Sequence, residues 1–594
     1  LLHTFGLTPY STGAGASSVN MVGVTIDASI DGSGADGVHA HDMKLNAEDL
    51  STVTTWTGAA SLAASLAGLG SVSLSIGVGL AENTINTVVT SGIRNAADVS
   101  TQADYTTTGS TTPALVAGAR VEVAPGYLTP ARTTESTAAL LTAGDRVQLS
   151  DTYLAPIFTS ADVGAEEFTR GSSVTVLADY SFGGTPIAAG VYRFKPLSGT
   201  ITPSAENYGD TTRWARIGGE NDAVYAFKGV TGTVDFGFEN YSDTSRWAKV
   251  DGVVGGMYEF VGPAGSVNLG RENYADASRW TPVAVGGIEI TADETATIRA
   301  TAMAASAALS ASFGASASLS GAGADATNII LSKVHATITD SAVATAGNTV
   351  LSATNESLID AQVKALSAAA SVGAVASAAA IGSSTAHNFI GWTAADTPQA
   401  AEVKATIVRS RIDVDGMLEQ TAEADQTIVA QIAALSAAVA GGLIGGAAAS
   451  GAGVDVVNKV SSTVEASISG RRNGFGVHAE GDITLRAQDT STILAAGAAS
   501  AVSASFGPGS VAIAVGVALG SNQISNTIAA FVDGSTVTTT TGGLTLEAIE
   551  AATIAATSQM AAVSLSTGVA IAGGGADSNG VVTTTTKAHV TNSS

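Results

Sequence analysis

The chain has no cysteine, few aromatic residues and few charged ones. Aromatic residues make up 5% and charged residues 13% of its 594 positions, whereas an average domain carries about 25% charged residues. The absence of cysteine excludes disulfides and thiol chemistry. With 26 basic against 51 acidic residues and no basic run, the chain lacks the positive surface that nucleic acids require. We therefore expect no nucleic-acid partner.

Long uncharged stretches are present, but their composition is not that of membrane-spanning helices. Residues 431–454 and 490–532 lack charge. A spanning helix needs about 20 mostly apolar residues, whereas these stretches are rich in Ala, Gly and Ser and recur as a repeat. We therefore expect a chain that is not transmembrane. Leu1-Leu2-His3 begins no signal-peptide pattern, so we expect any export signal to lie outside this sequence.

What the sequence does contain is a repeat of 61 to 69 residues with two marks. The first is an alanine followed six residues later by an apolar residue, and it occurs at Ala47, Ala292, Ala353, Ala422, Ala487 and Ala548. The second is an asparagine 31 to 36 residues after each alanine, at Asn83, Asn328, Asn388, Asn458, Asn522 and Asn579. Asn20 and Ile30 match the second half of a repeat, so we expect the sequence to open midway through one copy.

Between the two marks the pattern has a period of two. Val72, Leu74 and Ile76 alternate with Ser and Gly. Strict alternation is typical of strands, whose successive side chains face opposite sides. It outweighs the high helix propensity of the many alanines. The small-residue segment 496–505, followed by Gly507-Pro508-Gly509, predicts a hairpin with the next strand.

Repeats of this kind stack into a solenoid, because one copy cannot bury its own faces. We predict an all-β fold, a β-solenoid of the parallel β-helix type, in which residues 1–100 and 286–594 form one stack with the alanines one above another. Each repeat is expected to supply about three coils of roughly 20–25 residues. The asparagines predict a stacked amide ladder at a turn or, alternatively, side chains that each satisfy their own turn. The faces of Ser, Gly and Ala are expected to let another layer or coil approach closely. Because such shallow faces bury little area per residue, we expect stability to come from many identical stacked contacts, with unpaired strand edges that recruit further strands.

Residues 101–285 differ from the rest and are predicted to form an inserted β-rich module. They hold nine of the 12 prolines and three of the five tryptophans. Within them, Tyr-x-Phe, Glu-Asn-Tyr and Asp-x-x-Arg-Trp recur every 33 residues. The aromatic residues of the last two motifs are Tyr208, Trp214, Tyr241, Trp247, Tyr274 and Trp280. They either pack in a core or form exposed rows that contact cell-surface glycans. In the packing alternative, Asp starts a turn, Arg pairs with an acid, and Arg lies over the Trp face.

These units, together with the Ala/Gly/Ser repeats around them, resemble very large bacterial surface proteins. These are the filamentous-haemagglutinin-like, LEPR-XLL-type proteins with β-helical repeats. The resemblance implies export, a secreted or cell-surface location, a β-helical stalk and an adhesive or structural role in a fibre, filament or sheath. It supplies no catalytic residues. As the first partner we expect other copies of the same chain, associated into a filament or surface layer.

Signs of catalytic or metal chemistry are sparse. No nucleophile elbow, phosphate loop or His-x-x-x-His motif is present, so we expect no enzyme. The alternative is a carbohydrate-active β-helix enzyme, a polysaccharide lyase or hydrolase, which requires an acid/base cluster confined to one repeat. Calcium is the one cofactor considered, because Asp325, Asp455 and Asp577 each follow a glycine-rich stretch that echoes part of a calcium-roll motif. The copies are not in tandem, which favours glycine turns over metal sites.

Overall fold

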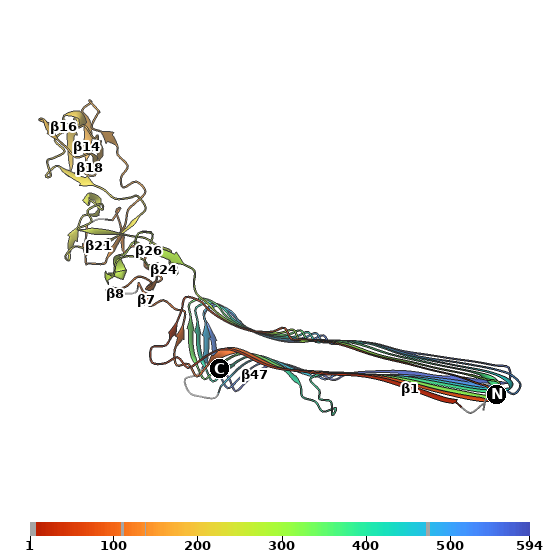
Figure 1. Cartoon of the computed structure of the whole chain (residues 1–594). Coiled ribbons are helices and arrows are strands. Elements are labelled where there is room, and N and C mark those ends of the chain that lie inside the picture. Colours follow the sequence, from red (N-terminus) through yellow and green to blue (C-terminus); the bar gives the residue numbers. More distant parts are fainter. Residues whose placement is uncertain (1–7, 108–111, 137, 471–475) are drawn as a thin grey trace. The chain divides into compact units, whose positions relative to one another are not determined.

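The computed structural model describes residues 8–107, 112–136, 138–470 and 476–594 and is all-β (Figure 1). The chain divides into two compact units. The segments up to Thr101 and from Gly286 onward form the first, and Gln102–Val285 forms the second. The first unit is a β-solenoid, because successive turns of its chain stack with their strands parallel and in register. The predicted fold class is confirmed.

One coil of the solenoid contains four kinds of strand. β27 (Ile288–Glu294) leads into an outbound strand, β28 (Thr297–Ser312), and after a far turn at Phe313 and Gly314 the chain comes back as a return strand, β29 (Ala315–Thr339). The short β30 (Ala342–Thr345) completes the coil. One repeat is therefore one coil, and the expectation of three coils per repeat is wrong. Alternation continues along strands of up to 34 residues, so the coil is far longer than in small solenoids.

The other coils repeat this plan. Strands equivalent to β27 are β3 (Met43–Asp49), β31 (Thr349–Asn355), β35 (Leu418–Ala424), β39 (Ile483–Asp489) and β44 (Leu544–Glu550). Outbound strands are β4 (Thr52–Ala67), β40 (Thr492–Phe506), β45 (Thr553–Ser566) and the first halves of β32 (Leu358–Ile390) and β36 (Thr427–Val460), which run on through the far turn. Return strands are β1 (Thr8–Asp31), β5 (Gly70–Arg94), β41 (Val511–Ile524) with β42 (Thr527–Asp533), β46 (Val569–Val582) with β47 (Thr585–Thr591), and the second halves of β32 and β36 with β33 (Ala401–Val408) and β37 (Ser462–Ser469). Short strands are β2 (Val38–His39), β6 (Val99–Ser100), β34 (Arg411–Val414), β38 (Gly476–Ala479) and β43 (Thr536–Thr539).

The alanine mark of the repeat forms one column through the stack. Ala292 pairs in register with Ala47 on one side and Ala353 on the other. The series continues through Ala422, Ala487 and Ala548. Equivalent alanines thus lie one above another, as predicted. Asn20 pairs with Asn83 in the same way, so the first segment joins the stack in the predicted register.

Outbound and return strands of one coil lie in two facing layers and do not pair with each other. β40 pairs with β36 and β45, and β41 pairs with β36 and β46, always in parallel. The predicted hairpin of residues 496–505 with the next strand is therefore wrong. The far turn carries the chain from one layer to the other, so every backbone ladder is formed with a neighbouring coil.

The core changes in character along each coil. Where the ends of the return strands meet the short strands and the β27-type strands, it consists of Ile, Val, Leu and Ala. A stack of mainly isoleucines follows, including Ile298, Ile330 and Ile359. Toward the far turn it consists mainly of Ala and Ser, with a few Val and Ile. We call the segment from Ala302 to Ala326, with the equivalent residues of the other coils, the thin part.

The second unit is built by nesting. Its first half supplies β9 (Arg120–Glu122), β12 (Arg146–Gln148) and β15 (Ser173–Val176), and these pair in reverse order with β24 (Met257–Phe260), β21 (Val224–Phe227) and β18 (Gly190–Phe194). Each pairing has its own buried cluster. β26 (Trp280–Val283), β23 (Trp247–Val250) and β20 (Trp214–Ile217) complete the three modules. Every 33-residue unit is therefore only half of a module, and its other half comes from residues 105–176.

Candidate functional surface

In the thin part, small side chains face the interior and large apolar side chains face solvent, which is the reverse of an ordinary β-layer. In β5, Ser73 and Ser75 are 0% exposed, whereas Ile76 is 45% and Leu80 40% exposed. The cause is the close approach of the two layers. A Cβ atom added at Gly77 would lie 2.5 Å from the carbonyl oxygen of Ala305 in β28. Mainly small side chains fit between the layers, so the expectation that the small-residue faces let another layer approach closely is confirmed.

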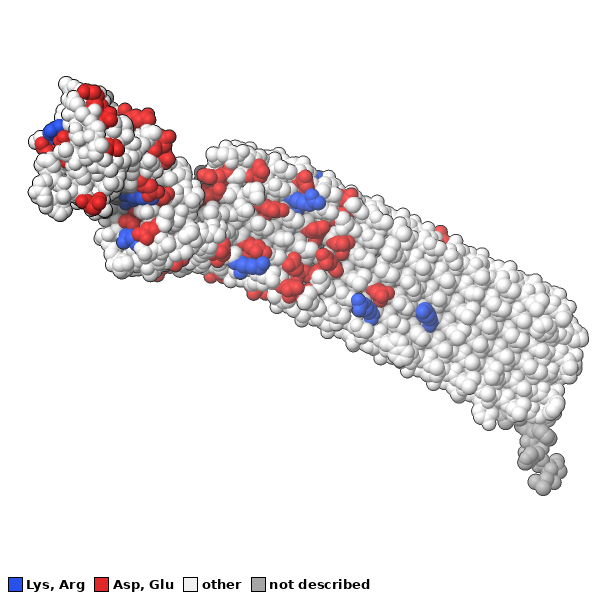
Figure 2. All heavy atoms as spheres, turned by 90° about the horizontal axis from the view of Figure 1, so that it is seen from above, with Lys and Arg blue, Asp and Glu red and all other residues white. Residues whose placement is uncertain are grey.

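The outside of the thin part is apolar and, between positions 304 and 324 and their equivalents, free of charge. In the coil of β28 and β29, no Asp, Glu, Lys or Arg occurs in residues 300–324, and the equivalent residues from position 304 to 324 are uncharged in every other coil. In the view of Figure 2, charged residues gather toward one end of the solenoid face and become sparse along it, and the part toward the other end shows none. An uncharged apolar surface of this extent is typical of an interaction site.

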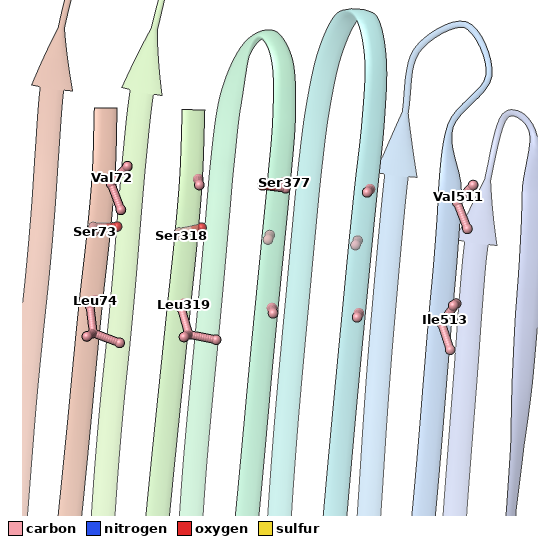
Figure 3. Close-up of a pocket in the computed structure, with 14 residues that line it drawn as sticks. Val72, Ser73, Leu74, Ser318, Leu319, Ser377, Val511 and Ile513 are labelled. Atoms are coloured by element: carbon pink, nitrogen blue, oxygen red, sulfur yellow. The ribbon is translucent and has the colours of Figure 1, made fainter. Parts of the chain in front are cut away.

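The return-strand side of the thin part contains a shallow apolar depression (Figure 3). Its volume is about 500 Å³. It forms because strands with short outer side chains, such as Ser377 of β32, lie between strands with larger ones, such as Val72 of β5 and Val511 of β41. Its outline thus follows from a difference between coils rather than from the repeat itself.

A second apolar hollow, of about 570 Å³, lies at the far turns. Leu66, Phe313, Leu443 and Phe506 line it, and Phe313 is 91% exposed. Large apolar side chains at these turns extend the uncharged surface around the end of the solenoid.

A ladder of buried asparagine amides runs through the stack. Each Nδ2 donates to the Oδ1 of the next residue at 2.7–2.8 Å, in the order Asn20, Asn83, Asn328, Asn388, Asn458 and Asn522. The predicted amide ladder is present, but it lies within the return strands and not at a turn. Asn579 is outside it, because Asn522 pairs in register with Gly580. The asparagine of the last coil is therefore offset by one residue from the register of the ladder.

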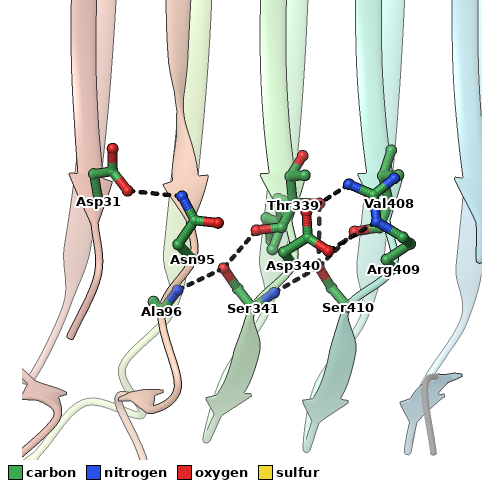
Figure 4. A network of polar contacts seen from close by, with 10 residues as sticks. Asp31, Asn95, Ala96, Thr339, Asp340, Ser341, Val408, Arg409 and Ser410 are labelled. Carbon is green, nitrogen blue, oxygen red and sulfur yellow. Dashed lines mark hydrogen bonds and ion pairs between the residues drawn. The ribbon is translucent and has the colours of Figure 1, made fainter. Parts of the chain in front are cut away.

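A polar column that the sequence analysis missed lies where the return strands end (Figure 4). Asn95, Asp340 and Arg409 adopt φ values of 53°, 50° and 46°. The Arg409 guanidinium donates to the Asp340 carboxylate, with Nε 2.8 Å from Oδ1. Below them, the Ser341 backbone N–H donates to Ser410 Oγ at 3.1 Å. The sequence signal for this column was the Gly, Asn or Asp that follows the end of most return strands, since these residues tolerate positive φ.

A second missed feature is a buried carboxyl column two residues after the anchor alanines. In register it contains Asp49, Glu294, Asn355, Asp489 and Glu550, with Ala424 in one coil. Burial raises the pKa of Glu294 to about 8 and that of Glu550 to about 7. Thr87 Oγ1 donates to Glu294 Oε1 at 2.5 Å, and Ser462 Oγ donates to Asp489 Oδ2 at 2.7 Å. For Glu294, the hydroxyl partner and the raised pKa are those of a neutral buried carboxyl.

The three aspartates considered for calcium share one column on the outer side of the return strands. Asp325, Asp455 and Asp577 are separated in register by Thr385 and Leu519, so they lie on alternate coils. The glycines before them lie inside extended strands, and the expected glycine turns are therefore wrong. Within the described residues, no group of three or more His, Cys, Asp or Glu is arranged to hold a metal ion. Calcium binding stays a prediction.

The six aromatic residues of the second unit are buried. Tyr208, Trp214, Tyr241, Trp247, Tyr274 and Trp280 are each 1% exposed. The indole N–H of Trp247 donates to Glu239 Oε2 at 3.1 Å, and the Arg246 guanidinium donates to both oxygens of the same carboxylate at 2.9 Å. Arg246 lies over Phe227, not over a tryptophan as expected. These rings form module cores, and a sugar ring has no access to them.

No protein-family model, curated protein or solved structure matches this chain. Among the helices of the described residues, none has the length and apolar character needed to cross a membrane.

Proposed function

We propose that the chain is a structural segment of a large secreted or cell-surface fibre, filament or sheath protein. The observation that carries this proposal is the amide ladder, in which five successive hydrogen bonds of 2.7–2.8 Å join one coil to the next. A buried amide has both a donor and an acceptor to satisfy, and stacking supplies both at once. Buried amides that join each coil to the next favour a long and rigid stack of coils.

The surface of the solenoid supports a role in association. Its thin part exposes large apolar side chains over an uncharged area. Surfaces of this kind typically mark sites of protein–protein interaction. The resemblance of the sequence to giant bacterial surface proteins supports an extracellular and adhesive setting. Glycan contact stays a prediction for surfaces other than the six buried aromatic residues.

Localisation and electron microscopy of the native protein test this proposal. An antibody against the 594-residue chain is expected to label the outside of intact producing cells, and purified native protein is expected to appear as rods or filaments. Label confined to the cytoplasm, or compact particles without an elongated stack, would contradict it. Release of unsaturated or reducing sugar from polysaccharides would instead favour the enzyme alternative.

A further inference from the structure

Six of the glycines on the outer side of the return strands have nothing of the chain packed against that side. They are Gly321 and Gly323 of β29, Gly451 and Gly453 of β36, and Gly573 and Gly575 of β46. A Cβ atom added at any of them meets no atom within 4 Å, and none has a φ in the left-handed region. Glycine weakens a strand, and in a strand interior it often marks a site that another backbone approaches closely.

Strands with large apolar side chains lie between these glycine strands. In register, one column reads Ile76, Gly321, Ile381, Gly451, Val515 and Gly573 from β5 to β46. The three large side chains of this column are 43–59% exposed. Because neighbouring strands are about 4.8 Å apart, the outer face at the level of this column has ridges and grooves with a period of about 10 Å. We call it the corrugated face.

We propose that the corrugated face is a homotypic interface, in which the ridges of one copy enter the glycine grooves of a second copy of this chain. This inference deepens the proposed self-association and rests on it. A two-fold axis parallel to the strands, between β29 and β32, places β5 of one copy against β36 of the other and β32 against β29. Each ridge then meets a groove on both sides of the axis, as an isologous interface requires.

The dimensions of the face suit a stable protein interface. From β1 to β46 there are six strand spacings of about 4.8 Å, and ten residues of the thin part span about 33 Å. The product is roughly 900–1,000 Å² per copy, compared with about 800 Å² per partner in specific complexes. The chain has a net charge of −25, but the ridges and grooves are uncharged up to position 324 and its equivalents. Two copies therefore meet there without opposing like charges.

Corrugation favours a second copy over a lipid surface as the occupant. Acyl chains are fluid and need no ridges or grooves. The outbound face is also apolar, yet its outer column of Ala307, Ala368, Ala437 and Val502 contains no glycine. A lipid occupant gives no reason for the glycine columns of the return face, whereas a self-complementary partner does.

Filling the groove tests the proposal. Gly451→Val with Gly453→Val places β-branched side chains where they meet nothing inside the chain. We expect the dissociation constant of the full chain, measured by sedimentation velocity, to rise at least tenfold. The thermal midpoint at concentrations below association should be unchanged or higher. Ala437→Val, on the outbound face of the same strand, is the matched control and should leave association unchanged.

A complementary variant makes the test specific. Ile76→Ala with Val78→Ala lowers the ridge of β5 that faces the filled groove. An equimolar mixture of the groove-filled and ridge-lowered chains should associate more tightly than either alone. If the two valines lower the thermal midpoint, the smaller change Gly451→Ala with Gly453→Ala is tested in their place. This variant is expected to associate more weakly than the wild-type chain.

Three outcomes would overturn the interface. Association unaffected by groove filling, or weakened equally by Ala437→Val, would show that another surface joins the copies. In that case the proposed fibre function would stand. A wild-type chain that stays monomeric in sedimentation but binds phosphatidylcholine vesicles would identify lipid as the occupant. A monomer that binds no vesicles would overturn both the interface and the proposed self-association.

Discussion

Gly77 of β5 faces the carbonyl oxygen of Ala305 in β28 so closely that a Cβ atom at this glycine would lie 2.5 Å from that oxygen. Gly79 has the same relationship to Met303, at 2.6 Å. This separation decides which side chains the thin part accepts inside and therefore which ones remain outside. The apolar exterior is a direct consequence of the close approach of two backbone layers.

Enlarging an inward-facing glycine should destabilise the solenoid. Gly77→Val forces β5 and β28 apart, and overpacking of this kind typically costs about 1–3 kcal/mol. Urea unfolding of the chain, at concentrations below association, should show a lower midpoint. Gly323→Val, on the outer side of the neighbouring strand, meets no atom within 4 Å and should not lower it. Equal effects of the two changes would contradict the inside-out arrangement.

Interrupting the amide ladder should be costly in a different way. Asn388→Leu keeps the side-chain volume but leaves the amide donor of Asn328 and the amide acceptor of Asn458 without partners. An orphaned buried polar group costs about 1–3 kcal/mol, so the unfolding midpoint should fall clearly. Asn579→Leu is the control, because that side chain is exposed and outside the ladder. A ladder variant as stable as the control would refute the structural role of the amides.

Much of the solenoid could be predicted from its sequence because the repeat marks are themselves buried contacts. Ala292 and Asn328 recur at fixed spacing since each pairs in register with its equivalents. The size of one coil could not be predicted, because alternation within a strand is the same whether the chain turns after 20 residues or 60. Nor does alternation say which side faces inward. The small size of Ser73, Ser75 and Gly77 indicated the side that another layer approaches, and the contact of Gly77 with the opposite layer confirms it.

The second unit shows a comparable limit. Its 33-residue repeat was evident from conspicuous residues such as Trp247, whereas the matching half of this module contributes Leu141, Val147, Leu149 and Tyr153. Those short apolar segments have no distinctive motif. Pairing between distant segments in reverse order therefore could not be read from the repeat alone.

The pH dependence of stability should depend on Glu294. Burial raises its pKa to about 8 in the folded chain, from an ordinary value of 4.5. Below pH 4.5 both states are protonated, and between pH 4.5 and 8 only the unfolded state ionises. Stability should therefore fall as pH rises through this window, by up to about 5 kcal/mol. Glu294→Gln should remove that part of the slope in urea unfolding. Identical slopes for both chains would contradict a buried neutral carboxyl.

The glutamate shared by Arg246 and Trp247 should stabilise its module. Glu239→Ala leaves the buried indole N–H of Trp247 without its acceptor, for which we expect a loss of about 1–3 kcal/mol. Thermal unfolding followed by tryptophan fluorescence measures it, since three of the five tryptophans lie in this unit. Glu167→Ala removes only an exposed hydrogen bond to Thr200 and should shift the transition little. A larger effect of Glu167→Ala would argue against the role of Glu239.

The claim on which the fibre proposal and the corrugated face both depend is that one repeat forms one coil. Because the chain has no native cysteine, spin labels can be attached at Asp325→Cys and Asp577→Cys, which lie in one column four strand spacings apart. Double electron–electron resonance, with labelled chains diluted in unlabelled ones, should give a backbone separation of about 19 Å, broadened by the label linkers. A separation near 60 Å, which three coils per repeat would produce at the same spacing, would contradict the account.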